Sequence, residues 1–476
     1  MQVIKIKLPN IKIFFLLMPL LLTEVNALES PVADAAKNGD IALIKQLLKG
    51  GVEVNEPQGD GMTALHWAAE RGNIELAEVL IYAGANPMAG TRIGQYKPLH
   101  LAAKKGNAGI IKILLDAGID PNIKTANSGS TALHLASASG DIESVTSLLF
   151  AGAKVNGREN AWGQTPLIFA AAANHVGVMH ALLDAGADPE LPSNIVDVIE
   201  MEKADQSAEK RINEIIAQFK EKEAGGTDWL PTAKQVQAAI ESGREIQRNW
   251  SAIQKAKEDK ENTALDTGEE FQQSVAIRQP DLPTVLTYNA DGEPVYELNP
   301  ETGGEKKDSR QSYGQMVGKW GGLTPLLHAI RQGHKEAVDL LLDSNVDINQ
   351  PSGDGTTPLL MAAINGQFDL AMKLIAKGAN PNIVSDAGAS ALFAVLERKW
   401  APKASYAHPI EHQQQQTTHL DLIRALLESG ADPNIRMNQH LWYTEYTFFV
   451  MSSGGIHFAG ATPFWRAAQA LSLIHI

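Results

Sequence analysis

Residues 97–118 read KPLHLAAKKGNAGIIKILLDAG, and this stretch holds the features that decide the fold. Gly106 stands nine residues after Lys97, and Gly118 stands twenty-one residues after it. Glycine adopts the left-handed backbone that ends a helix at little energetic cost. The stretch therefore predicts two short helices, each ended by a glycine.

The same spacing recurs along the chain. The equivalent starts are Thr63, Lys97, Thr131 and Thr165, spaced 34 residues apart, and later Thr324 and Thr357. The residues at the first offset are Gly72, Gly106, Gly140, Asn174, Gly333 and Gly366, and those at the second are Gly84, Gly118, Gly152, Gly186, Asn345 and Gly378. This period predicts a stack of helix pairs, an all-α repeat solenoid in which each repeat contacts its neighbours.

The residues that open each repeat have physical roles. Threonine at the start caps the first helix, and the proline after it fits the first helical turn. His66, His100 and His134 recur with the same period and are expected to bond back to the turn, tying neighbouring repeats together. Such positions lie about 10 Å apart in stacked helices, too far to share a metal ion. We interpret these histidines as structural.

These motifs resemble ankyrin repeats over residues 28–194 and 320–438. The motifs that carry the resemblance are Thr63-Ala64-Leu65-His66, Lys97-Pro98-Leu99-His100, Thr131-Ala132-Leu133-His134 and the Gly-Ala-Asn-Pro of residues 84–87. The resemblance implies a curved solenoid with hairpin loops at right angles and a concave face that binds proteins. Two departures are Lys97 in place of the capping threonine and Lys399-Trp400-Ala401-Pro402 in place of a glycine.

The chain is also similar to large exported bacterial ankyrin-repeat proteins with a long central insertion, a likeness that implies no established activity. Residues 1–27 are typical of an export signal, with lysines followed by the apolar Ile13–Leu22 and small residues before the cleavage point. The alternative is an uncleaved membrane anchor, although the apolar run is about half of the ~20 residues that a span needs. We expect a periplasmic or secreted protein without stable membrane insertion.

The remaining chain divides by composition and period. Its expected parts are repeats one to five (28–194), an insertion (195–319), repeats six to eight (320–438, with a second insertion at 400–418), an irregular segment with a truncated ninth repeat (439–470), and a tail (471–476). Leu471 stands where glycine or asparagine is expected, so we interpret the tail as non-native sequence; the alternative is an unusual natural terminus.

The long insertion is expected to project as an arm from the hairpin edge between repeats five and six. Its expected parts are helical stretches at 196–223 and 231–258, a polar loop-like segment at 259–283, a hairpin at 285–298 and a flexible linker at 299–318.

Charge and exposed side chains point to a protein partner. The net charge of −14 argues against a nucleic-acid reader, which needs clustered lysine and arginine. The candidate partner-binding residues are Arg92, Tyr96, Lys124, Arg158 and Trp162 on loops, and Glu70, Arg71, Lys104 and Lys105 on first helices. Tyrosine and tryptophan beside arginine are common interface anchors; the alternative is that these residues are merely solvated. They favour one or more proteins with an acidic or mixed-charge patch.

The sequence supports an enzymatic function less well than protein binding. The segment His408-Pro409-Ile410-Glu411-His412 has the H-x-x-E-H spacing of some zinc peptidases, but Pro409 and the glutamines that follow do not suit the required helix. We therefore predict no catalytic residues, no metal and no cofactor. The alternatives are a hydrolase or metal-binding activity in the insertions or in a missing C-terminal region, and a secreted effector that acts in a host.

Overall fold

The structure is a computed structural model. It describes residues 30–223, 226–227, 229–266, 285–288, 294–296, 313–400, 414–439 and 459–474. The expected export signal and the H-x-x-E-H segment lie outside the described residues. The described residues fall into two compact units, one within residues 30–154 and one within residues 155–474.

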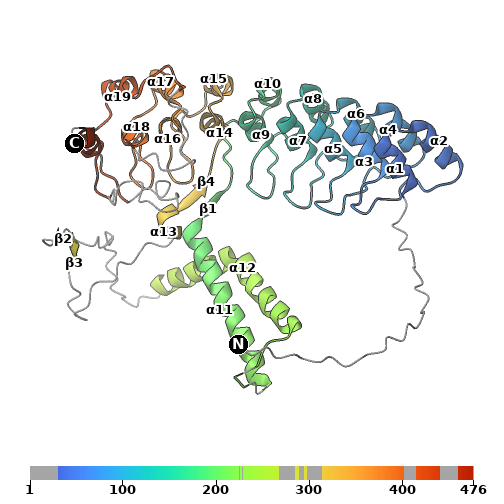
Figure 1. The fold of residues 1–476 in the computed structure, drawn as a ribbon, viewed down its shortest axis with the longest axis horizontal. Helices are drawn as coiled ribbons and strands as arrows, with labels where there is room; N and C mark the ends of the chain where they lie inside the picture. Colours follow the sequence, from blue (N-terminus) through green and yellow to red (C-terminus); the bar gives the residue numbers. More distant parts are fainter. Residues whose placement is uncertain are drawn as a thin grey trace, which may run out of the picture. The chain divides into compact units, whose positions relative to one another are not determined.

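Residues 30–154 form four consecutive helix pairs, drawn in blue to teal in Figure 1. The first helices are α1 (Pro31–Asn38), α3 (Ala64–Arg71), α5 (Pro98–Lys105) and α7 (Ala132–Ser139), and the second helices are α2 (Ile41–Lys49), α4 (Ile74–Tyr82), α6 (Ala108–Asp116) and α8 (Ile142–Phe150). First helices pack on first helices and second helices on second helices, so the two sets form separate layers. The predicted all-α repeat solenoid is confirmed.

Residues 155–476 repeat the arrangement. The pairs are α9 (Pro166–Ala172) with α10 (Val176–Asp184), α14 (Pro325–Gln332) with α15 (Lys335–Asp343), α16 (Pro358–Ile364) with α17 (Phe368–Ala376), and α18 (Ala391–Trp400) with α19 (His419–Glu428). A last helix, α21 (Pro463–Ile474), packs on α18 in the way that one first helix packs on the next.

The helices end where the period predicts. Gly72 and Gly106 follow α3 and α5 with φ of 69° and 70°, in the left-handed region. At Asn174 and Asn345 asparagine takes the glycine position, and both have φ of 57°. Asparagine is one of the few other residues that tolerate this conformation, so the chain turns at the same position of the repeat with asparagine as with glycine.

The insertion begins and ends as a two-stranded sheet. Strand β1 (Ile195–Asp197) pairs antiparallel with β4 (Lys319–Gly321), so that the residues on either side of the insertion lie together. Beyond this sheet, α11 (Val198–Lys222) packs on α12 (Ala233–Asp266) and α13 (Tyr313–Val317), and β2 (Val285–Tyr288) pairs with β3 (Pro294–Tyr296).

Two expectations for the insertion are wrong. Residues 259–266 belong to α12 rather than to a loop, because no glycine or proline interrupts the chain between Gly243 and Gly268. Residues 313–317 form a short helix inside the expected linker. There the backbone N–H of Gly314 donates to the Glu202 carboxylate of α11 at 2.6 Å, a long-range contact that local composition cannot reveal.

The repeats on either side of the insertion stack directly on each other. Helix α9 packs on α14, and α10 packs on α15. The Nε2 of His334, before α15, donates to the Ala172 carbonyl at 3.1 Å. Asn107 bonds in the same way to Ala69 of the preceding repeat, at 2.8 Å. The insertion therefore extends a hairpin loop without separating repeats five and six.

Candidate protein-binding surface

The first helices of residues 30–154 bury one side and leave the other accessible. In α3, Leu65, Ala68 and Ala69 are buried, whereas Trp67 and Glu70 are half-buried and Arg71 is exposed. Positions four, seven and eight after the start lie on one side of a helix because its period is 3.6 residues. We call the accessible side the first-helix face; its members are Trp67, Glu70, Arg71, Leu101, Lys104, Lys105 and Leu135.

Two of the four predicted charged residues on this face form an ion pair across two helices. Glu70 is half-buried and lies 3.7 Å from the Nζ of Lys105 on the neighbouring α5. Arg71 and Lys104 are exposed and make no ion pair within the described part of the chain. The face therefore presents basic groups that are available to a partner.

The predicted loop residues of the same unit divide into two kinds. Arg92 and Lys124 are exposed. Tyr96 is half-buried, and its ring contacts His100 edge-on at a centroid distance of 6.1 Å. Its hydroxyl oxygen also accepts from Asn127 at 3.4 Å. Tyr96 thus helps to hold adjacent loops together besides presenting part of its ring.

The two predicted residues in residues 155–476 differ in the same way. Arg158 is half-buried and donates to the Gly163 carbonyl at 3.2 Å, so it braces its own loop. Trp162 is 53% exposed, and its ring lies edge-to-face against Trp320 of β4, with centroids 5.9 Å apart. Trp320 was not expected from the sequence to lie at a binding surface.

The buried histidines fix the hairpin loops to the first helices. The Nδ1 of His66 accepts the Thr63 N–H at 3.1 Å, and its Nε2 lies 2.9 Å from the Tyr96 carbonyl of the next loop. This arrangement requires a neutral ring with its proton on Nε2. His100 bonds in the same way to Lys97 and Ile123, which explains why α5 begins normally without a capping threonine. Burial lowers the pKa of both His66 and His100.

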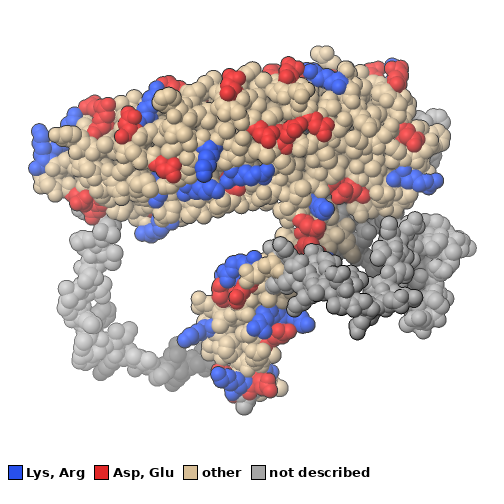
Figure 2. All heavy atoms as spheres, turned by 180° about the vertical axis from the view of Figure 1, so that it is seen from behind, with Lys and Arg blue, Asp and Glu red and all other residues tan. Residues whose placement is uncertain are grey.

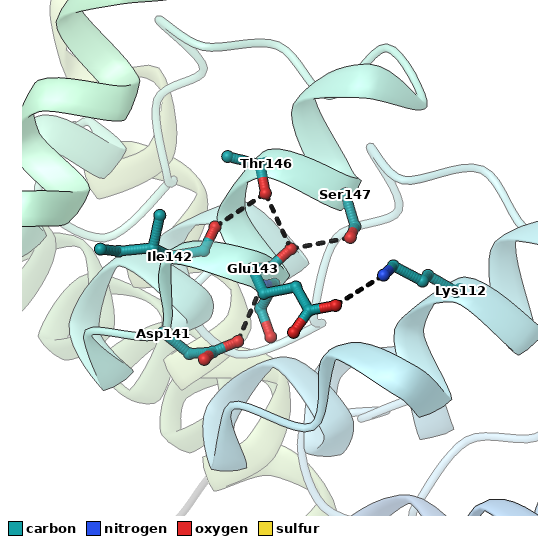
Figure 3. Close-up of polar contacts among 7 residues, drawn as sticks. Lys112, Asp141, Ile142, Glu143, Thr146 and Ser147 are labelled. Atoms are coloured by element: carbon teal, nitrogen blue, oxygen red, sulfur yellow. Dashed lines mark hydrogen bonds and ion pairs between the residues drawn. The ribbon is translucent and has the colours of Figure 1, made fainter.

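Two lysines of the second helices form ion pairs with the neighbouring second helix. Lys112 of α6 contacts Glu143 of α8 at 2.6 Å (Figure 3), as Lys45 of α2 contacts Glu75 of α4 at 2.8 Å. The hydroxyls of Thr146 and Ser147 donate to carbonyls one turn earlier in α8. In Figure 2, basic and acidic side chains occur over the repeats with uncharged surface between them.

The family comparison decides what these helix pairs are. A family model described as ankyrin repeats (3 copies) matches residues 32–125, 99–193 and 296–385, together more than half of the chain. The chain is an ankyrin-repeat protein. Ankyrin repeats generally mediate binding between proteins, and the family is typically non-enzymatic.

Curated ankyrin relatives match only parts of the chain. It is 31% identical over 121 residues to the B-cell lymphoma 3 protein homolog of Mus musculus, covering 25% of this chain and 23% of that protein. It is 40% identical over 52 residues to myotrophin of Xenopus tropicalis, covering 11% and 44%. It is 39% identical over 67 residues to protein phosphatase 1 regulatory subunit 27 of Mus musculus, covering 14% and 44%. The chain thus spans less than half the length of each.

Sequence reasoning missed the apolar members of the first-helix face. Trp67, Leu101 and Leu135 each follow their repeat start by four residues and are half-buried. The indole N–H of Trp67 donates to Gln58 at 2.9 Å, and the Nζ of Lys37 lies 5.3 Å from its ring centroid. The 34-residue period contains the signal, because these residues fall between buried positions on the accessible side of the ankyrin first helix.

Other kinds of site find no support in the described residues. Within them, no three histidine, cysteine, aspartate and glutamate side chains gather closely enough to hold a metal ion. No helix in the same part of the chain is long and apolar enough to cross a membrane.

Proposed function

We propose that this chain is a non-enzymatic protein-binding scaffold whose first-helix face engages one or more proteins. The observation that carries the proposal is a difference between the two helix layers. Arg71 and Lys104 are exposed without ion pairs in the described structure, beside half-buried Trp67 and Leu101, whereas Lys45 and Lys112 of the second helices are each paired with a glutamate. Apolar side chains flanked by available cations are a common composition for a binding surface.

The partner has an acidic or mixed-charge patch with apolar side chains at its centre. Arg92, Tyr96 and Lys124 extend the basic surface from the first helices of the first unit to its loops. Trp162, in the loop that Arg158 braces through Gly163, provides a further contact in the second unit. The charge pattern supports this reading because Arg71 and Lys104, which make no ion pair within the described residues, gain most from an opposite charge supplied by another molecule.

The scaffold works in the periplasm or outside a bacterial cell. The support is the sequence of residues 1–27, with its basic start, short apolar core and small residues at the cleavage point. The absence of cysteine is compatible with an oxidising compartment, because a chain without cysteine can form no disulfide, native or incorrect.

The test compares charge removal on the two helix layers. The double variant Arg71→Ala with Lys104→Ala removes two unpaired cations from the first-helix face. The matched control, Lys45→Ala with Lys112→Ala, removes two lysines from the second helices. Affinity capture from a periplasmic extract is expected to lose its partner with the first variant and keep it with the second, while circular dichroism shows both folded. Equal capture by both variants contradicts the proposal.

A further inference from the structure

Repeat four differs from its neighbours at two buried positions. Its helices are α7 and α8, and Ser137 in α7 and Ser144 in α8 are both completely buried. The residues at the same places in repeats two, three and five are Ala69, Ala103 and Ala171 for Ser137, and Leu76, Ile110 and Val178 for Ser144. Repeat four therefore buries hydroxyl groups where these neighbours bury only hydrocarbon.

Neither hydroxyl makes a hydrogen bond. The Oγ atoms of Ser137 and Ser144 are buried and bond to no other group. Within residues 30–154, all of which the structure describes, no other buried side-chain nitrogen or oxygen lacks a partner. Such a hydroxyl has lost its hydrogen bonds to water and gained none in return. Each one therefore lowers the equilibrium constant for folding of its surroundings by about tenfold.

The other hydroxyls of the same two helices are paired. Ser139 in α7 donates to the Ala136 carbonyl at 2.9 Å, and Ser147 in α8 donates to the Glu143 carbonyl at 2.7 Å (Figure 3). Both serines are half-buried. Thr146 donates to the Ile142 carbonyl in the same way. The lack of partners at the two buried serines thus follows from their positions in the core.

Ser144 also contributes less to the core than the side chains at its place in the neighbouring repeats. Leu76, Ile110 and Val178 are almost completely buried, and each places more apolar surface between the helices than serine does. The stability of a repeat stack is approximately the sum of the stabilities of its repeats and of the contacts between neighbours. A deficit in one repeat therefore stays local, and in the first unit it lies at α7 and α8.

We infer that repeat four is a point of local opening, at which α7 and α8 reversibly lose their packing while α3 to α6 stay folded. Leu135 of α7 belongs to the first-helix face. Each opening therefore removes one end of that face and leaves the part on α3 and α5 intact. The inference rests on the core of the helix pair and is independent of whether the face binds a partner.

Native-state amide hydrogen exchange of the full chain, followed by mass spectrometry of its peptides, measures this opening. In a uniform stack, an interior repeat has a neighbour on each side, so repeats three and four would be protected equally. We expect instead that the protection factors of amides in α7 and α8 are lower than those in α5 and α6 by about tenfold or more.

A matched pair of double variants tests the cause. Ser137→Ala with Ser144→Ala removes both unpaired hydroxyls. The control, Ser139→Ala with Ser147→Ala, removes one paired hydroxyl from each of the same helices and makes the same change in intrinsic helix propensity. The first variant is expected to raise the protection factors of α7 and α8 by about tenfold or more relative to the control, and to leave those of α3 and α4 unchanged.

Two results overturn the inference. If α7 and α8 are protected as strongly as α5 and α6 in the unaltered chain, repeat four does not open before its neighbour. If the two double variants protect α7 and α8 equally, the buried hydroxyls are not the cause of the opening, as when a buried water satisfies both of them.

Discussion

The buried side chain of His328 lowers the stability of the folded repeats, and does so more strongly at acidic pH. It lies in α14, four residues after Thr324, where other repeats have Leu101 and Leu135. Its side chain is almost fully buried, and its Nε2 bonds to no other group. Burial, with a smaller contribution from the Arg331 charge, lowers the pKa of His328 from 6.5 to about 4. A leucine in its place is expected to remove this penalty.

The size of the effect follows from the two pKa values. Because the pKa is lower in the folded chain, the unfolded chain binds more protons, and stability falls as the pH drops below 6.5 towards about 4. One pKa unit corresponds to about 1.4 kcal/mol, so the whole loss is about 3 kcal/mol. About 2 kcal/mol of it is already lost at pH 5. The unpaired Nε2 costs a further ~1–3 kcal/mol at any pH.

The assay is urea unfolding followed by circular dichroism at pH 7.5 and pH 5. His328→Leu is expected to raise the free energy of unfolding at pH 7.5, and its advantage over the wild type grows by about 2 kcal/mol at pH 5. His180→Leu, which replaces an exposed histidine in α10, is the control and should leave the pH difference unchanged. If the free energy of unfolding falls by the same amount from pH 7.5 to pH 5 in His328→Leu and in the wild type, the reasoning is refuted.

Further predictions concern the last helix, the insertion and metal binding. Arg466 of α21 contacts Glu397 of α18 at 2.6 Å, with 3% and 5% of the side chains exposed. Arg466→Met leaves the Glu397 carboxylate buried without its cation, and is expected to lower the free energy of unfolding by about 3 kcal/mol or to detach α21 from α18. Detachment is seen as faster amide hydrogen exchange in α21 of this variant than in α21 of the Glu397→Gln variant. Replacing residues 199–317 with a two-residue turn should leave the thermal transition cooperative and raise stability by at most about 3 kcal/mol, from the shorter loop; loss of the transition contradicts direct stacking. Purified chain should contain no stoichiometric zinc by mass spectrometry, and one zinc per chain that disappears with His412→Ala revives the peptidase reading.

The repeats are predictable from sequence because each one depends on local chemistry. Left-handed glycines end the helices, and Asn174 and Asn345 replace them at the same positions with the same conformation. The short helix at 313–317 could not be predicted, because its anchor, Glu202, lies far away in the chain.

The candidate surface was predicted only in part, because some of its contacts also join residues that are far apart in the chain. Arg71 and Lys104 could be recognised from their place in the period, and both are exposed. The contact between Trp162 and Trp320 forms only when repeats five and six stack across the insertion, so neither local pattern nor period reveals it. Arg158 looks like an available cation in the sequence, but its guanidinium donates to Gly163 in its own loop.

The central claim is that partners bind the first helices rather than the second. The second helices offer an alternative binding surface, because Phe150 at the end of α8 is 96% exposed. A photoreactive phenylalanine analogue placed at Leu101, and separately at Phe150, tests the two surfaces directly in cells that make the chain. The account predicts a covalent protein adduct from position 101 and none from position 150; an adduct from position 150 alone would contradict it.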